Sequence, residues 1–284
     1  MAQHPWNTTF TWQSHTAASG VVTQAQIDQF DELGYFVVED LYSPEELAEL
    51  TRITDEAEDE AIAELKRQAD ERFLISENGA ITFAGQLVRQ KPEIRPFVKN
   101  KKILGICLDL IGPNVRMYHD QAVYKMTEKP RRFPWHQDNG YLFVEPQHYL
   151  TCWIALTDAT IDNGCPQVAP GLHKDGTLAH YYVDTLGYEC FEEPPMDPLV
   201  AEVKAGGAVF FSSLTPHLTG PNFTNSTRKA YIVQYASSVR VCWKAMLKLE
   251  TPPGHMQSAM SLVGLQSWKM EWRLPARQAS MLWQ

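Results

Sequence analysis

The stretch from Val209 to Ala236 reads VFFSSLTPHLTGPNFTNSTRKAYIVQYA. It contains two runs of β-branched and aromatic residues, which are typical of β-strands, separated by Gly, Pro and Asn residues, which are typical of turns. His217 lies near the end of the first run, and Arg228 opens the second. If the two runs pair as an antiparallel hairpin, Arg228 lies beside His217 and Thr219.

The same texture extends over the whole region from Asn114 onward, where short apolar runs alternate with turns rich in Gly, Pro, Asn and Asp. The candidate strands are VRMYHDQAVYKM (115–126), YLTCWIALTDA (149–159), LVAEVKAG (199–206), AVFFSSLTPHLTG (208–220) and RKAYIVQYAS (228–237). Several short strands at such spacing are typical of an antiparallel sandwich or barrel. The sequence therefore predicts a mainly β fold.

Helical patterns precede this β region. Residues 23–73 contain two of them, on either side of a short β run, YFVVED. Ser43 is placed to cap the second helix, with Pro44 at its first position and Glu46 completing a capping box. A third helix, RPFVKNKKILGICLDLIG, is expected to end near Gly112. We therefore expect helices to flank the β core.

Two further segments bear on domain organisation. Residues 175–198 lack clear periodicity and predict a long connection, which in a compact domain is often a functional lid. Residues 256–284 are rich in Met and Trp and predict a weak helix with a tail, which packs on the barrel or covers a ligand. We expect one domain over residues 1–284, with N-terminal helices at about 24–112, a barrel core at about 114–240 and a C-terminal tail at 241–284.

Composition excludes several classes of function. The 284-residue chain has a formal net charge of -9 and no Lys/Arg run, so nucleic acid is not an expected partner. No apolar stretch approaches the roughly 18 to 20 residues of a membrane span, and the start lacks a signal-peptide pattern. The 5 cysteines are scattered and form no C-x-x-C pair, which indicates reduced thiols. We expect a cytoplasmic protein.

A second stretch, FPWHQDNGY (133–141), places an imidazole and a carboxylate on either side of one residue. If it borders a strand, the two-residue period puts His136 and Asp138 on one face and Gln137 on the other. These donors suit ferrous iron, and a second histidine would complete a two-His-one-carboxylate triad with three open positions. His217 is the best candidate for that ligand. The alternative for the isolated motif is an ordinary surface turn.

Arg228 adds an independent signal. An arginine at the start of an apolar strand is costly to bury unless its donors meet a carboxylate or phosphate. The alternative is an arginine exposed to water at the strand end. A His-x-Asp motif, a distal histidine and an arginine eleven residues after it together favour a metal site with an anion site nearby.

On these residues the chain resembles the phytanoyl-CoA dioxygenase-like group of iron(II)- and 2-oxoglutarate-dependent oxygenases. The resemblance covers most of the chain, in five segments that occur in the family's order. They are LGYFVVEDLYSPEE, HDQAVYKMTEKPRRFPWHQDNGYL, LTCWIALTDATIDNGCPQVAPGLHKDG, GGAVFFSSLTPHLTGPN and STRKAYIVQYA.

The resemblance implies a double-stranded β-helix, also called a jelly roll or cupin-like barrel, with helices packed on one side. It implies Fe(II) bound by His136, Asp138 and His217, with 2-oxoglutarate and O2 as cosubstrates. The positions that match the family's cosubstrate pocket are Arg228, Thr219, Trp153 and Gln121. Some relatives carry a polar cosubstrate ligand at the position of Phe133. This chain differs from them there, which affects the assignment of further polar contacts and leaves the triad and Arg228 unaffected.

The substrate side is less defined by the sequence. Candidate substrate contacts are Trp135, Tyr141, Phe143 and His173, and the aromatic members of this set are equally compatible with a packed barrel core. Arg131 and Arg132 precede the metal motif, where they either contact an anionic substrate or lie on a solvated loop. His119 is expected either in the core or facing the pocket, and His4, His15, His148, His180 and His255 are expected at the surface or in tails.

The implied activity is oxidation, by default hydroxylation, of an apolar small molecule with release of succinate and CO2. Desaturation, epimerisation and ring rearrangement use the same kind of iron centre, and the prime substrate and oligomeric state are not predicted. A cupin-type isomerase, lyase or 2-oxoglutarate-independent oxygenase is the alternative, which the presence of Arg228 disfavours. A barrel that binds a ligand without catalysis is a second alternative, which the intact triad disfavours.

Overall fold

The computed structural model describes residues 1–237, 242–244 and 271–273. Its helices are α1 (Gln24–Leu33), α2 (Pro44–Leu65), α3 (Leu87–Gln90), α4 (Arg95–Val98), α5 (Lys101–Ile111) and α6 (Asp138–Tyr141), and short 3-10 helices cover Pro92–Ile94, Ile161–Asn163 and Leu172–Asp175. Among the described residues, no helix combines the length and apolarity needed to cross a membrane.

The largest sheet has the strand order β1-β13-β8-β15-β5-β4-β3-β2, with β17 also paired to β5. Their bounds are β1 (Tyr35–Val38), β13 (Ala208–Ser212), β8 (Leu150–Ala155), β15 (Arg228–Ser237), β5 (Asn114–Lys125), β4 (Ile81–Gly85), β3 (Ser76–Glu77), β2 (Arg72–Phe73) and β17 (Glu271–Arg273). The paired strands of this sheet are antiparallel throughout the described residues.

A second sheet has the order β12-β9-β14-β6. It is formed by β12 (Leu199–Val200), β9 (Pro166–Val168), β14 (His217–Thr219) and β6 (Phe133–His136), and two small ribbons pair β10 (Tyr181–Val183) with β11 (Gly187–Glu189) and β7 (Phe143–Glu145) with β16 (Cys242–Lys244). The chain passes between the two sheets repeatedly, from β5 to β6, from β8 to β9 and from β13 through β14 to β15. This alternation is the double-stranded β-helix, so the predicted fold class is confirmed.

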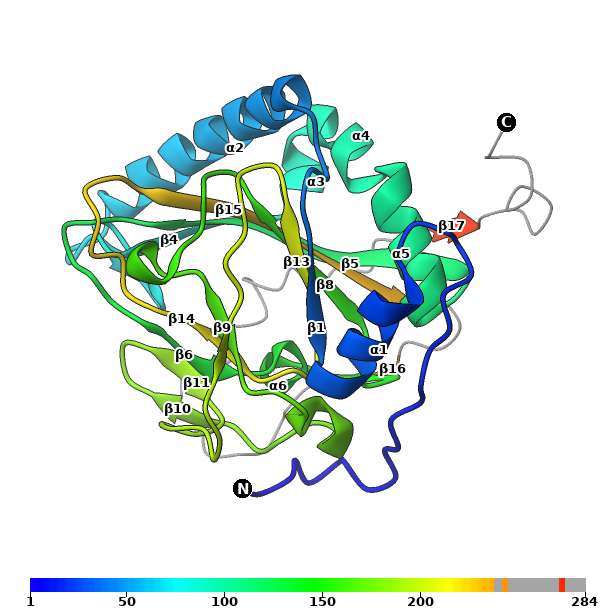
Figure 1. Ribbon diagram of the computed structural model, residues 1–284. Coiled ribbons are helices and arrows are strands. Elements are labelled where there is room, and N and C mark those ends of the chain that lie inside the picture. The colour runs from blue at the N-terminus through cyan, green and yellow to red at the C-terminus, as the bar shows by residue number, and fades with distance from the viewer. Residues whose placement is uncertain (238–241, 245–270, 274–284) are drawn as a thin grey trace.

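Alternation along the strands of the large sheet separates two hydrophobic layers. One face packs against α1, α2 and α5, and carries Cys152, Ile154, Tyr231 and Val233. The other face points between the sheets and carries Trp153, among others, in a separate cluster. In Figure 1 the helices α2, α4 and α5 lie along one side of the large sheet, with β6, β9 and β14 on the other side. The region between the sheets is therefore the place for a site.

The helix signals in the sequence are reproduced. Ser43 caps α2 with a capping box to Glu46, as predicted. The third predicted helix is divided into α4 and α5, because Asn100 accepts a hydrogen bond from the backbone of Lys102 and starts a new helix there. That helix ends at Ile111, next to Gly112, as expected.

The predicted strand over residues 208–220 is wrong as one element. It is divided into β13 and β14, which belong to different sheets. The backbone N–H of Thr215 donates to the Ser212 carbonyl (2.8 Å) and forms a turn, and Pro216 has no N–H to continue a ladder. The hairpin between residues 217–219 and Arg228 is also wrong, because β14 pairs with β6 and β9 whereas β15 pairs with β5 and β8.

Other segments differ in detail. Only Leu199–Val200 of the predicted strand 199–206 is a strand, followed by an isolated bridge from Val203 to Ala159. The connection 175–198 contains the β10–β11 ribbon, and β4 was not predicted. Of the C-terminal stretch predicted as a weak helix, only Glu271–Arg273 is described, and it forms β17 against β5; the rest lies outside the described residues.

Candidate metal centre

His136 and Asp138 lie where one element ends and the next begins. His136 is the last residue of β6, and Asp138 is the first residue of the single-turn helix α6. The stretch thus borders a strand, and the two side chains converge as expected: His136 Nε2 is 3.9 Å from Asp138 Oδ1. Gln137 between them has extended backbone, so the two-residue period continues past the end of β6 and places both side chains on one side.

His217 faces them from the neighbouring strand. β14 pairs antiparallel with β6 so that His217 lies directly opposite His136, with ring centroids 4.1 Å apart. One ligand atom from each of His136, Asp138 and His217 can be chosen so that all lie within 4.8 Å of one another. Such an arrangement of two imidazoles and one carboxylate fits a single metal ion and leaves coordination positions open.

Both imidazoles are oriented by backbone carbonyls. Nδ1 of His136 donates to the Pro134 carbonyl (2.9 Å), and Nδ1 of His217 donates to the Thr215 carbonyl (2.9 Å). These bonds place the proton on Nδ1 and leave Nε2 with its lone pair, which is the form that binds a metal. Burial lowers the pKa of His136 to about 3 and that of His217 to about 4, so both are neutral at pH 7.

The carboxylate is oriented from the large sheet. The hydroxyl of Thr151, on β8, donates to Oδ2 of Asp138. Burial raises the pKa of Asp138, while the neighbouring His136 and the Thr151 hydroxyl oppose that rise. A metal ion would stabilise the ionised carboxylate further and offset the cost of burying it.

The residues between and after the ligands point elsewhere. Gln137 is fully buried, and its side-chain amide bonds to backbone groups of Gly176, Leu178 and Leu214. The backbone N–H of Gln137 donates to Nε2 of His180 (2.9 Å). Gln137 therefore serves the loop's structure, in agreement with the expectation that it points away from the metal.

His180 was missed by the sequence reasoning, which placed it at the surface. A Cβ on Gly140 would lie 2.1 Å from the His180 ring, so that ring packs directly on the α6 backbone. The surface placement is also wrong for His4, which is 3% exposed, and for His148, which bonds to Ser212 and to the Leu110 carbonyl. The only sequence signal for His180 is the small residue at position 140, some forty residues away.

Arg228 is the residue predicted to hold an anion near the metal ligands. It is 1% exposed, and among the described residues none accepts a hydrogen bond from its Nε, Nη1 or Nη2. Its guanidinium carbon lies 5.0 Å from the centroid of the Trp153 ring. Burial lowers the pKa of Arg228 to about 9, so the side chain is still a cation at pH 7. A buried guanidinium with all its donors free fits a carboxylate ligand.

Lys125 is opposite Arg228 in the pairing of β5 with β15 and is also 1% exposed. Its ammonium donates to the carbonyls of Arg131 (3.0 Å), Thr219 (2.9 Å) and Gly220. Burial, and next the charge of Arg228, hold the pKa of Lys125 well below its usual value. Two basic side chains are thus buried side by side, and Lys125 donates to neutral carbonyls.

The other predicted cosubstrate residues lie on elements around Arg228. Trp153 is 2% exposed and is the ring beneath the guanidinium. Thr219 is in β14, two residues after His217, and its carbonyl binds Lys125. Gln121 is in β5, opposite Ile232 of β15 and on the same alternation as Lys125. Their direct contact with a cosubstrate stays a prediction.

Three of the four substrate candidates are packed against protein. Trp135 lies in a cluster with Phe191, at 5.6 Å between centroids. Phe143 is fully buried and stacks on His4 at 4.7 Å. His173 is fully buried and packs edge-on against Trp12 at 4.4 Å. These placements favour the packed-core alternative for all three.

Tyr141 remains beside the metal ligands, in a group of partly exposed aromatic rings. Its ring lies 5.4 Å from His136, and Phe133 lies 4.7 Å from the same imidazole. Phe83, on β4, extends the group at 5.8 Å from Phe133, and Tyr188 extends it at 5.5 Å from Tyr141. Phe133 therefore gives an apolar wall next to the metal ligands. We call Phe83, Phe133, Tyr141 and Tyr188 the aromatic wall.

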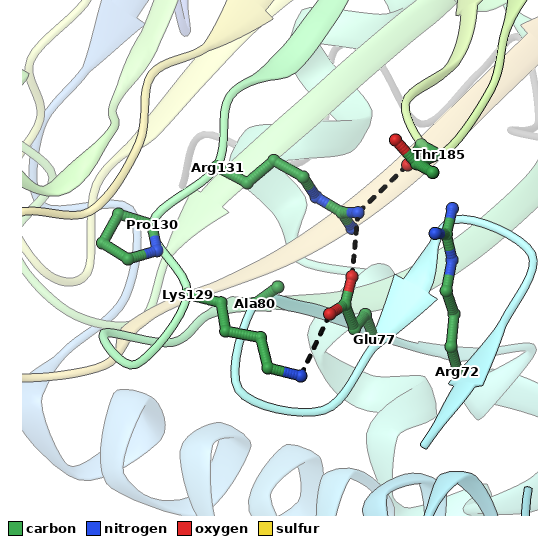
Figure 2. A pocket seen from close by; sticks show the side chains of 7 residues that line it. All are labelled: Arg72, Glu77, Ala80, Lys129, Pro130, Arg131 and Thr185. Carbon is green, nitrogen blue, oxygen red and sulfur yellow. Dashed lines mark hydrogen bonds and ion pairs between the residues drawn. The ribbon is translucent and has the colours of Figure 1, made fainter. Parts of the chain in front are cut away.

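The two arginines that precede the metal motif bind within the protein. Arg131 donates to Glu77 (3.1 Å) and to the Thr185 carbonyl (3.0 Å), as Figure 2 shows, and Arg132 pairs with Glu189. The surface pocket in Figure 2 is lined by Arg72, Glu77, Ala80, Lys129, Pro130, Arg131 and Thr185. Glu77 accepts from both Lys129 and Arg131, so Arg131 is neither a free anion site nor on a solvated loop.

Residues 30–230 match the family model described as Phytanoyl-CoA dioxygenase (PhyH). The chain is 27% identical to the peroxisomal phytanoyl-CoA dioxygenase of Mus musculus over 244 residues, covering 80% of this chain and 72% of that protein. It is 25% identical to the phytanoyl-CoA dioxygenase of Arabidopsis thaliana over 262 residues, covering 79% of this chain and 92% of that protein.

Solved structures share the fold. The non-haem α-ketoglutarate-dependent carbocyclase SnoK from nogalamycin biosynthesis matches with a TM-score of 0.66 at 22% identity, covering 84% of this chain and 92% of that chain. EvdO2 from Micromonospora carbonacea var. aurantiaca, complexed with 2-oxoglutarate, matches with a TM-score of 0.62 at 22% identity, covering 81% of this chain and 95% of that chain. With a family model that spans most of the chain, these findings show that the protein belongs to the phytanoyl-CoA dioxygenase family of iron(II)- and 2-oxoglutarate-dependent oxygenases.

Proposed function

We propose that this protein oxidises an apolar small molecule, by hydroxylation as the default outcome, using Fe(II) held by His136, Asp138 and His217 and 2-oxoglutarate held by Arg228. The observation that carries the proposal is the pairing of a complete metal-ligand triad with a buried guanidinium that lacks a hydrogen-bond partner among the described residues. Iron and 2-oxoglutarate, when bound, supply the oxidising chemistry, and succinate and CO2 are the products.

The protein's own residues perform the binding and the orientation. Pro134 and Thr215 carbonyls fix the two imidazoles, and the Thr151 hydroxyl fixes the carboxylate. Arg228 supplies two parallel donors for the distal carboxylate of 2-oxoglutarate, and Trp153 closes one side of that pocket. Thr219 and Gln121 are the further cosubstrate contacts that we propose.

The aromatic wall supports an apolar substrate. Phe83, Phe133 and Tyr141 present rings and partly exposed surface next to His136. An apolar ligand that covers these rings would gain burial energy and would exclude water from the metal. Relatives include enzymes named as a carbocyclase, an epimerase and a hydroxylase, so the outcome of the oxidation is the part of the proposal most open to test.

The test is anaerobic titration with Fe(II), followed by measurement of succinate formed from 2-oxoglutarate and O2 without a prime substrate. We expect stoichiometric iron binding and slow uncoupled turnover. His217→Ala should abolish iron retention, because two ligands on one loop bind far more weakly than three. The absence of both iron binding and succinate formation by the unmodified protein would refute the proposal.

A substrate screen then addresses the apolar class. Apolar compounds that stimulate succinate formation are analysed by mass spectrometry for a gain of one oxygen atom. Phe133→Ser should lower the stimulation by apolar compounds about tenfold, because removing a large apolar ring costs on the order of 1–3 kcal/mol of binding. Stimulation by charged compounds alone would contradict the apolar class and leave the cosubstrate assignment intact.

A further inference from the structure

The metal-binding loop is held through the residues that alternate with its ligands. Gln137 and Asn139 are both fully buried. The backbone N–H of Gln137 donates to His180, and the side-chain amide of Asn139 donates to the Thr177 hydroxyl at 2.7 Å. Fixing Gln137 and Asn139 fixes the backbone from which both His136 and Asp138 project.

One segment supplies most of these partners. Residues 176–180 lie between a 3-10 helix and β10 and belong to no strand or helix of their own. Besides Thr177 and His180, the segment provides the Gly176 carbonyl, which accepts from Gln137 Nε2 (3.0 Å), and the Leu178 N–H, which donates to Gln137 Oε1 (2.6 Å). An irregular segment that fixes a metal loop must itself be held by its surroundings.

The N-terminal arm, residues 1–22, provides that support through its backbone. The N–H of His4 donates to the Thr177 carbonyl (2.9 Å), and the N–H of Ala179 donates to the Ala2 carbonyl (2.9 Å). These two bonds flank an antiparallel bridge from Gln3 to Leu178. The arm thus lies against the segment as a short added strand.

Buried side chains continue the contact from the arm to the loop. Asn7 Nδ2 donates to the carbonyls of Asp175 (2.8 Å) and Thr177 (3.1 Å), and Asn7 Oδ1 accepts from Gln147 Nε2 (3.2 Å). Gln147 Oε1 accepts from the Thr177 hydroxyl (2.9 Å), which in turn accepts from Asn139. The donors and acceptors therefore run without a break from Asn7 to the residue after Asp138.

The residues of this hydrogen-bonded chain are shielded from water. Asn7 is 8% exposed, Gln147 is 4% exposed and Thr177 is fully buried. A buried polar network whose members are all satisfied is rigid, and removing one member leaves the others without partners.

We infer that the N-terminal arm is a positioning element of the metal centre: residues 2–7 fix segment 176–180, and this segment fixes the orientation of His136 and Asp138. Asn7 and Thr177 are positioning residues in this scheme, because neither touches the metal ligands. The inference rests on the proposed function for its metal, and it adds a part of the chain outside the matched family region, residues 30–230.

The first test is the Fe(II) dissociation constant, measured by anaerobic titration of the full chain. Groups that orient metal ligands typically change affinity about 10- to 100-fold when removed. We expect a loss of about tenfold for Asn7→Ala and Thr177→Val, and more for deletion of residues 2–9. Co(II) in place of Fe(II) gives a visible absorption band whose shape reports the ligand geometry, and we expect that shape to change in the variants.

The matched control is Tyr42→Phe. It removes one partly buried hydrogen bond, from the Tyr42 hydroxyl to the Phe97 carbonyl (2.9 Å), in the helical layer. This variant should lose stability comparable to Thr177→Val while keeping its Fe(II) affinity and Co(II) band. Equal loss of metal affinity in Tyr42→Phe would show a general effect of stability and overturn the inference.

The second test needs no metal. Amide hydrogen exchange at Gln137 and Asn139 should be faster in Asn7→Ala and Thr177→Val than in the unmodified protein and in Tyr42→Phe. Unchanged exchange, or Fe(II) affinity within twofold in both point variants, overturns the inference even if the deletion variant fails to fold. If the unmodified protein binds no Fe(II), the proposed function fails, and the exchange rates alone decide whether the arm holds the loop.

Discussion

Lys125 and Arg228 lie opposite each other on the paired strands β5 and β15, are equally buried and are both basic, yet their hydrogen-bond partners differ completely. Lys125 donates to three backbone carbonyls, whereas no described residue accepts from Arg228. The carbonyl partners of Lys125 offset part of the cost of burying its amine, so the structure depends on keeping those bonds. A buried cation without partners destabilises the free protein and is explained by an anion that binds there.

The largest expected effect comes from removing the unpartnered cation. Arg228→Met should raise the KM for 2-oxoglutarate by roughly a hundredfold, since it removes two charge-assisted hydrogen bonds. The free energy of unfolding without ligands should be unchanged or higher, because an uncompensated buried charge is lost. Succinate formation over a range of 2-oxoglutarate concentrations and urea unfolding measure the two quantities.

Lys229→Met is the control for this variant. Lys229 is the next residue on β15, points to the helical face and pairs with Asp55 at 2.7 Å. It should leave the KM for 2-oxoglutarate unchanged. If Arg228→Met also leaves the KM unchanged, Arg228 does not bind 2-oxoglutarate. The difference between Arg228 and Lys125 in hydrogen-bond partners would then have no bearing on function.

The next effect has the opposite pattern. Lys125→Met leaves three carbonyls without a donor, so the free energy of unfolding should fall by about 2–4 kcal/mol. The KM for 2-oxoglutarate should rise far less than in Arg228→Met, because the ammonium is already saturated by carbonyls. A variant with normal stability and a hundredfold higher KM would assign Lys125 to the cosubstrate instead.

The sequence identifies the metal-ligand candidates and Arg228, because these residues stand out by their type alone. A histidine, a carboxylate and an arginine are each conspicuous in apolar strands, so His136, Asp138, His217 and Arg228 were selected before any pairing was known. The reason given for placing Arg228 near His217 was a hairpin that does not exist. The two are in one barrel because β14 and β15 lie in facing sheets, which local periodicity cannot reveal.

Contacts between distant segments account for the rest of what was missed. Lys125 was ordinary in the sequence, because its three carbonyl partners come from residues 131, 219 and 220. His180 and Asn7 were equally ordinary, because their roles depend on packing against residues 140 and 175–177. A polar residue signals its burial only when its partners are close in sequence, as Ser43 and Glu46 are.

Repulsion between the two cations gives a smaller, testable effect. Arg228 contributes to lowering the pKa of Lys125 in the folded protein. The charged ammonium therefore contributes less to the free energy of unfolding while Arg228 is present. In a double-mutant cycle, Lys125→Met should therefore cost about 1 kcal/mol more in an Arg228→Met background than in the unmodified protein. Additive changes in the free energy of unfolding would mean that the two side chains do not interact.

His173 sets the limit of the comparison, because it also has a buried nitrogen, Nδ1, without a hydrogen-bond partner. Burial lowers its pKa to about 4, so at pH 7 this ring is neutral and needs no counter-ion. Its other nitrogen donates to the Asp31 carbonyl (3.2 Å), and its ring packs against Trp12. The unpaired nitrogen of this neutral ring therefore does not require an anion, in contrast to the buried guanidinium of Arg228.

The smallest predicted effect tests this limit. The unfolded-state pKa is about 6.5 and the folded-state pKa is about 4, so the unfolded chain takes up a proton first as the pH falls through this window. The unmodified protein should then lose about 1 kcal/mol of unfolding free energy at His173 between pH 7 and pH 5.5, a loss that His173→Gln should not show. Urea unfolding at the two pH values measures the difference, with succinate formation expected to stay unchanged in the variant. At pH 7 the His173→Gln substitution alters no charge. A lower rate of succinate formation at that pH would make His173 a candidate site residue again, and a neutral side chain with an unpaired atom would then indicate a functional site as well as a charged one.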